Sequence, residues 1–198
     1  MFRWEDGAIV ASASIPGRAT SMAVAAAPVV AVGSDDGRVR IYDASAPSAL
    51  HLMHIAELHT AAVTHVAFTA GGEHIMSVGG GSLVFTSTRA PFRPQAFLPV
   101  PAGCTVLRLH ATRGPGTTTE VTAVVARDID ASVGSLLLLL SVPAAFTASH
   151  FLPKSPLELA GKAVGLRQIS APGSDGIVCA VQAKQSLLVL LADGGLRE

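Results

Sequence analysis

Short apolar runs alternate along the chain with clusters of glycine, proline, aspartate and serine. The runs are rich in valine, isoleucine and leucine and show little helical spacing, so the pattern predicts strands joined by turns. The clearest pair of strands is 29–33 and 38–43, which flank a Ser-Asp-Asp-Gly turn at 34–37. Asp-Gly supplies the positive φ angles of a tight hairpin, and alternating polar and apolar residues give the second strand two different faces.

The other apolar runs fall into further groups of strands. A strand at His51–Glu57 opens the second group, and the last strands that we assign to the four groups are centred on Ile41, Val84, Leu138 and Val189. These centres are 43, 54 and 51 residues apart, which indicates an internal repeat. We therefore predict four units at 8–43, 51–88, 96–141 and 150–193, preceded by a separate strand at 1–7.

Two segments carry a family resemblance. The motif Ser34-x-Asp36-x-x-Val39-x-Ile41-Tyr42-Asp43 resembles the end of a WD40 repeat, with Tyr42 in place of the usual tryptophan and Asp43 as the closing aspartate. Leu58-His59 resembles the Gly-His opening of the next repeat, with Leu58 in place of glycine. The resemblance implies a structural role, within the hydrogen-bonded chain that holds a WD40 blade together, for His59, Ser34, Asp36 and Tyr42. His59 falls in the repeat after the other three, so no single repeat contains the whole chain of bonds.

The resemblance implies an all-β fold, a WD40-like β-propeller of about four blades. Closed propellers usually have more blades, and an open row of blades leaves sheet surface uncovered. We therefore expect a partial propeller that needs further blades to close its ring. A different interpretation remains open for the last two units, which have strand lengths that also suit an unrelated β-sandwich.

Composition narrows the class of protein. Of the 198 residues 49% are hydrophobic and 14% are charged, which is enough apolar material for a core. The formal net charge is zero and the basic residues are scattered, so we expect no nucleic-acid partner. Cys104 and Cys179 lie far apart without other ligand pairs, which argues against a zinc site and a disulfide framework.

The N-terminus does not resemble a signal peptide, and no apolar run has the length of a membrane helix. We therefore expect an intracellular protein without membrane attachment. The cytoplasm is the favoured compartment, and the cilium, the cytoskeleton and the nucleus remain open.

The sequence offers no arrangement of residues that we assign to catalysis, metal binding or cofactor binding. The alternative from another class is a propeller-type hydrolase or lactonase with a central metal site. Such an enzyme needs acidic or histidine ligands at the starts of the innermost strands, where this chain has Thr20, Val63, Thr105 and Ala163. We therefore expect a protein that is not an enzyme and that uses no cofactor.

Propellers of the WD40 family hold partner proteins on the loops at their rims, so the resemblance implies a non-catalytic scaffold in a multiprotein complex. The partners that we expect are other proteins of that complex. Arginine is favoured at contact sites between proteins, and three arginines lie close to the best-defined repeat. The candidate partner-binding residues are Arg18, Arg38 and Arg40.

Overall fold

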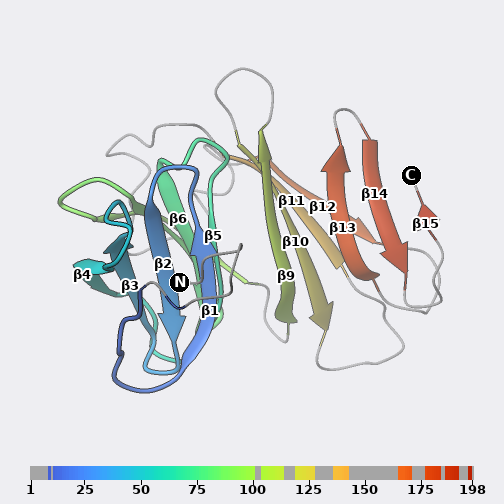
Figure 1. The fold of residues 1–198 in the computed structure, drawn as a ribbon. Helices are drawn as coiled ribbons and strands as arrows, with labels where there is room; N and C mark the ends of the chain where they lie inside the picture. Colours follow the sequence, from blue (N-terminus) through green and yellow to red (C-terminus); the bar gives the residue numbers. More distant parts are fainter. Residues whose placement is uncertain are drawn as a thin grey trace.

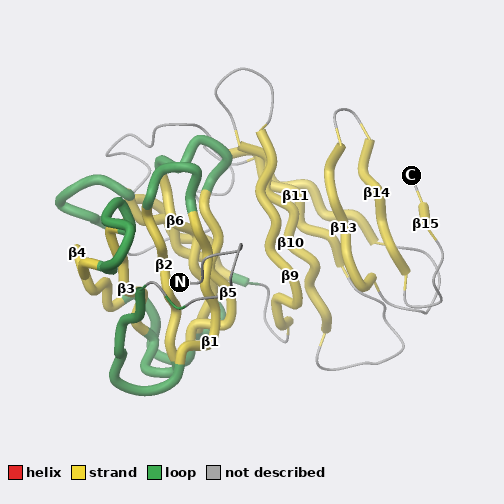
Figure 2. The backbone as a smooth tube through the Cα atoms, viewed as in Figure 1, coloured by secondary structure: helices red, strands yellow, loops and turns green. Residues whose placement is uncertain are grey.

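The computed structural model consists of antiparallel strands and connecting loops, and no described residue is helical (Figure 2). It describes residues 9, 11–100, 104–113, 119–127, 136–142, 165–170, 177–183, 186–191 and 196–197. Within these ranges, no helix has the length and apolar character needed to cross a membrane. The all-β prediction is confirmed.

The first two sheets each contain four strands in sequence order. The strands of the first sheet are β1 (Ala19–Val24), β2 (Val29–Ser34), β3 (Arg38–Asp43) and β4 (His51–Glu57). Those of the second sheet are β5 (Val63–Phe68), β6 (His74–Gly79), β7 (Ser82–Ser87) and β8 (Pro94–Pro99). Each strand pairs antiparallel with the next, so every sheet is a simple meander.

The C-terminal half repeats this plan. The third sheet contains β9 (Cys104–Arg113), β10 (Thr119–Arg127), β11 (Leu136–Val142) and β12 (Gly165–Ser170). The described strands of the fourth sheet are β13 (Ile177–Ala183), β14 (Ser186–Leu191) and β15 (Leu196–Arg197). The first strands of the four sheets, β1, β5, β9 and β13, lie next to one another in that order. The sheets follow one another from the blue end of the chain to the red end (Figure 1).

The strands are grouped differently from the units that we predicted at 8–43, 51–88, 96–141 and 150–193. The strand at 51–57 has the predicted bounds, but it pairs with β3 and completes the first sheet instead of opening the second. In the same way β12 pairs with β11, and β8 pairs with β7. Alternation and turn residues mark each strand, whereas the choice of a neighbour depends on contacts distant in sequence. Each predicted unit is therefore displaced by about one strand.

Two further expectations concern the ends of the sheets. No strand is formed over residues 11–15 of the unit that we expected at 8–43, and the strand expected at 1–7 lies outside the described residues. Val189 lies on β14, which is the middle strand of the three described in the fourth sheet, so it does not correspond to Ile41, Val84 and Leu138 on third strands.

The first and second sheets pack face to face. Ala31, Val39 and Ile41 of the first sheet are at most 1% exposed and lie in one apolar cluster with Val63 and Ile75 of the second. Burying a valine or isoleucine side chain contributes about 1.5–3 kcal/mol. The contact therefore fixes the position of the first sheet on the second.

The opposite face of the second sheet packs against the third sheet. Met76 and Phe85, neither of them exposed to solvent, form an apolar cluster with Val106, Val121 and Ala123. All six residues of β6 are buried. The second sheet is thus covered on both faces, which is the environment expected of an internal blade of a propeller.

Glycine permits a close approach at the turn between β2 and β3. Gly37 has a φ of +80°, and a Cβ added there would lie 2.2 Å from the carbonyl oxygen of His59. The backbone amide of His59 donates to the carbonyl of Gly37 at 3.2 Å. This turn therefore bonds directly to the loop that leads into the second sheet.

Replacing this glycine should cost more than replacing a glycine of similar conformation in open space. Gly81 has a φ of +74°, and a Cβ added there would have no atom within 4 Å. We expect Gly81→Ala to lower the free energy of unfolding by about 1 kcal/mol through backbone strain alone. Gly37→Ala should lower it by roughly 2 kcal/mol more, because its methyl group also displaces the His59 loop. Urea denaturation of both variants measures this difference, and equal losses would contradict the close approach.

Candidate functional site

The turn between β2 and β3 is held by side-chain hydrogen bonds. Ser34 Oγ donates to Asp36 Oδ1 at 2.6 Å, and the same carboxylate oxygen accepts from the amide of Arg38 at 3.1 Å. Ser34 is fully buried at the end of β2. The Ser34 and Asp36 side chains therefore stabilise the hairpin, a structural role of the kind that the WD40 resemblance implies.

Arg40 completes this cluster from β3. Its Nη2 lies 2.8 Å from Asp36 Oδ2, and its Nη1 donates to Ser34 Oγ. The arginine side chain is only 2% exposed, and its Nε has no hydrogen-bond partner among the described residues. Arg40 is thus a buried structural residue, and the prediction that it contacts a partner is wrong. Alternation along β3 indicated that the Arg40 side chain would face solvent. Instead it extends toward the carboxylate of Asp36, which lies four residues earlier in the turn.

The buried guanidinium controls the charge of the turn. Hydrogen bonds from Arg40 and then from Ser34 hold the pKa of Asp36 well below its usual range, against an opposing effect of burial. Asp36 is therefore ionised throughout the neutral range. Its negative charge is the counter-ion without which Arg40 would be buried unpaired.

His59 forms a second, separate cluster in the second sheet. Its Nδ1 lies 2.9 Å from the carbonyl oxygen of Gly79 and 3.2 Å from Ser82 Oγ, and its Nε2 lies 2.9 Å from Ser77 Oγ. Burial lowers the pKa of His59, and the bond to Gly79 opposes that shift. The imidazole therefore favours the neutral form, which can bridge a carbonyl acceptor and a hydroxyl group. Ser77 and Ser82 were not singled out from the sequence, since only strand pairing brings them to this histidine.

The two remaining motif residues lie on β3 at the end away from the hairpin turn. Tyr42 is 4% exposed, and no hydrogen bond from its hydroxyl to Ser34, Asp36 or His59 is found among the described residues. Asp43 accepts from the amide of Ser45 at 2.8 Å, and this bond lowers the pKa of the carboxyl group. Of the five motif residues, Ser34 and Asp36 thus belong to the first cluster, His59 belongs to the second, and Asp43 belongs to the turn after β3. Tyr42 is buried on β3.

Charged side chains surround the hairpin turn, and we call this surface the charged rim. Arg38 is 43% exposed and bonds to Glu57 through Nη2 at 2.8 Å and through Nε at 3.1 Å. The amide of Arg18 donates to Asp35 Oδ1 at 3.0 Å. The charged rim consists of Arg18, Asp35, Asp36, Arg38 and Glu57. The structure leaves two of the partner-contact candidates accessible, Arg18, which is exposed, and Arg38, which is partly exposed.

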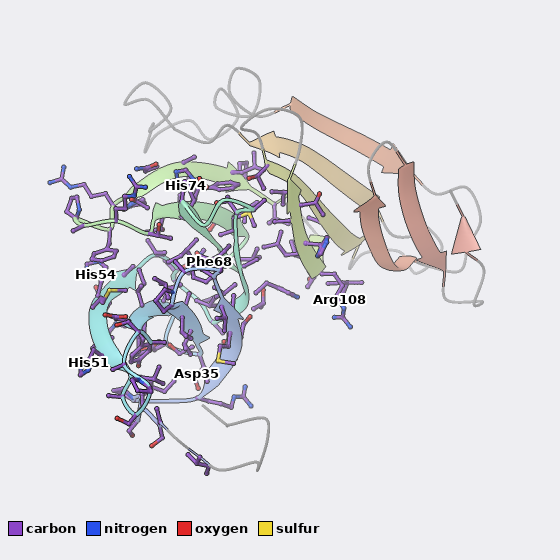
Figure 3. The ribbon with its side chains drawn as sticks, turned by 45° about the horizontal axis from the view of Figure 1, so that its top comes forward. Asp35, His51, His54, Phe68, His74 and Arg108 are labelled. Carbon is purple, nitrogen blue, oxygen red and sulfur yellow. The ribbon has the colours of Figure 1, made fainter. Side chains whose placement is uncertain are left out.

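The described histidines do not form a group of metal ligands. Figure 3 shows His51, His54 and His74 apart from one another, and His54 stacks on Phe92 with ring centroids 5.1 Å apart. His74 Nε2 lies 2.8 Å from Gln95 Oε1. In the part of the chain that the structure describes, no group of three histidine, cysteine, aspartate or glutamate residues has the geometry of a metal site.

Thr20 donates to the carbonyl of Val63, so its hydroxyl joins two innermost strands.

Comparison with known proteins finds solved structures with a similar arrangement of sheets. No family model matches the chain, and no curated protein matches it. Among solved structures, the designed protein Ika4 is 13% identical, with 96% of each chain covered and a TM-score of 0.60. The designed protein Ika8 is 12% identical over 98% of this chain and 50% of its own, with a TM-score of 0.61.

Two natural structures share the same fold. The β-propeller domain of Cps50 (Swd1) from Myceliophteria thermophila is 10% identical, covers 89% of this chain and 51% of its own, and has a TM-score of 0.57. The fold is that of a partial β-propeller. A chain of the Mitotic Checkpoint Complex is 12% identical over 94% of this chain and 62% of its own, with a TM-score of 0.50. The chain thus spans about half the length of most of these structures.

The role of the Arg40 cluster can be tested by removing its negative charge. Asp36→Asn should lower the free energy of unfolding by about 2–4 kcal/mol, because it leaves the buried guanidinium without a counter-ion. In an Arg40→Met background the same substitution should cost less than about 1 kcal/mol. Asp35→Asn, at the exposed neighbouring position, is the matched control and should cost less than about 1 kcal/mol. Equal costs of Asp36→Asn in both backgrounds, measured by urea denaturation, would contradict the coupling.

Proposed function

We propose that this chain is a non-catalytic WD40-repeat scaffold that binds other proteins in a multiprotein complex. The observation that carries the proposal is the charged rim, where exposed Arg18 and partly exposed Arg38 lie beside a hairpin fixed by internal hydrogen bonds. A turn that is already ordered loses little conformational entropy when a partner binds. The motif residues Ser34, Asp36 and His59 support the WD40 assignment because they stabilise the turn and the loop beside it.

The likeness to a chain of the Mitotic Checkpoint Complex supports a role in assembly. On this proposal the partners are protein subunits, and neither nucleic acid nor a membrane is engaged. The favoured compartment is the cytoplasm. The proposal involves no cofactor and no chemical reaction, and the candidate hydrolase or lactonase is not favoured by any specific observation in the structure.

A charge reversal at the rim tests this function. Wild-type protein is used as bait in an extract of its native cells, and we expect it to retain a reproducible set of proteins. The amount of each of these proteins retained by the Arg18→Glu, Arg38→Glu double variant should be at least tenfold lower. Both arginines are on the surface, so reversal should change the melting temperature little. Quantitative mass spectrometry of the retained proteins is the measurement.

The control reverses two arginines of the loop between β7 and β8. Arg89 and Arg93 are exposed. Their loop lies at the opposite end of the second sheet from the β6–β7 turn, which corresponds to the β2–β3 turn of the first sheet. The Arg89→Glu, Arg93→Glu variant should retain the wild-type set of proteins. An absence of specific partners, or the same loss with both variants, would contradict a partner site at the charged rim.

A further inference from the structure

One polar bond joins the innermost strands of the second and third sheets. His65 of β5 pairs with Val78, which belongs to the apolar cluster between these two sheets, so its side chain points toward the third sheet. Its Nε2 lies 2.9 Å from the carbonyl oxygen of Leu107 on β9. A carbonyl oxygen only accepts, so Nε2 carries the proton and is the donor. We call this hydrogen bond the His65 link.

The link connects two irregularities of strand pairing. Thr64 of β5 has no opposite residue in β6, and Leu107 of β9 has none in β10, because the register shifts by one residue at both places. Each is therefore the extra residue of a β-bulge. A bulge changes the direction of the groups beside it, which accounts for a carbonyl of β9 that accepts a bond from the neighbouring sheet.

The second ring nitrogen of His65 is also occupied. Its Nδ1 lies 3.1 Å from Thr64 Oγ1. Because Nε2 donates to Leu107, Nδ1 of the neutral ring is an acceptor, and the Thr64 hydroxyl donates to it. A proton added to Nδ1 turns this acceptor into a donor, so the imidazolium form loses the bond from Thr64.

A permanent positive charge shares the acceptor of the link. Arg108 of β9 is exposed (Figure 3), and its Nη1 donates to the same carbonyl oxygen of Leu107 at 2.8 Å. An imidazolium at His65 would therefore place two positive charges on one carbonyl oxygen. Burial lowers the pKa of His65 and the charge of Arg108 adds to this shift, while the bond to Leu107 opposes it.

The strands around β5 supply no compensating negative charge among their described side chains. β1, β2, β6 and β9 pack against β5. β1 and β2 contain no titratable residue. In β6 and β9 the titratable residues with described side chains are His74, Arg108 and His110, and none of them is a carboxylate. A proton on His65 thus has no described counter-ion on the strands that surround it.

We propose that the His65 link is a proton-sensitive joint between the second and third sheets, which holds at neutral pH and is released in mildly acidic solution. Release weakens the contact that positions the third sheet on the second. The inference rests on the packing of these two sheets and not on the proposed scaffold function, so either can fail without the other.

The direction of the pH effect follows from the lowered pKa. The folded chain binds a proton at His65 less readily than the unfolded chain, so stability rises with pH in this range. The contribution of the link is fully present above the ordinary pKa of histidine, about 6.5. It is lost progressively as the pH falls below that value toward the lower pKa of the folded protein.

Hydrogen exchange of the full chain tests the joint at pH values of about 7.5 and 5.5, on either side of the ordinary pKa of histidine. Protection factors, corrected for the intrinsic effect of pH on exchange, are compared for β5 and β9 in the wild type and in His65→Gln. The glutamine amide can still donate to Leu107 but does not titrate. Between the two pH values, protection should fall about threefold more in the wild type than in His65→Gln, the effect of losing one hydrogen bond.

Other histidines are controlled in the same experiment. Burial also lowers the pKa values of His59 and His74, but both residues titrate in the wild type and in His65→Gln, so their effect cancels in the comparison. The matched control is His110→Gln. His110 is exposed on β9 and takes no part in the link, so this variant should show the wild-type fall in protection.

A second variant decides the question if His65→Gln loses protection at both pH values. Arg108→Gln removes a surface charge and leaves the link in place, so it should raise the pKa of His65, measured by NMR, and move the loss of protection to higher pH. An equal fall in the wild type and in His65→Gln, or an unchanged His65 titration in Arg108→Gln, would overturn the proposal. A fall in protection that His110→Gln abolishes would overturn it as well.

Discussion

The structure depends on the face-to-face packing of sheets, and most of all on the burial of the second sheet between its two neighbours. A single sheet cannot cover its own apolar faces, so these faces must pack against a neighbouring layer. Here Ile75 of β6 contributes to the cluster with the first sheet, and Met76 contributes to the cluster with the third. Adjacent residues of one strand thus stabilise two different contacts. The second sheet therefore ties its two neighbours into one stack.

Hydrogen-bonded clusters complement this apolar packing at the ends of the strands. Arg40, Asp36 and Ser34 fix the hairpin of the first sheet, while His59 joins the loop before β5 to the turn between β6 and β7. In both clusters the side chains bond to one another or to the backbone of a turn, which is a structural role. The consequence for function is a surface whose turns are held in place and whose outermost charges, on Arg18 and Arg38, face solvent.

Local sequence was enough to locate several strands but not to group them. The bounds of β4 at 51–57 were predicted from alternation and turn residues, yet its partner strand was not, because sheet pairing depends on residues distant in sequence. The hydrogen-bond partners of His59 could not be predicted for the same reason, since Ser77 lies 18 positions away in the sequence. Arg40 was expected at the surface because arginines usually are, and its burial follows from the position of Asp36 in a turn that only the fold defines.

The central claim is that the second sheet is internal and covered on both faces. Native-state amide hydrogen exchange followed by mass spectrometry tests it most directly, because protection reports how far the surrounding structure must open. The account predicts the slowest exchange in β6 and β7 and faster exchange in β4, whose outer residues are exposed. Exchange in β6 and β7 as fast as in β4 would contradict the stacked arrangement of the sheets.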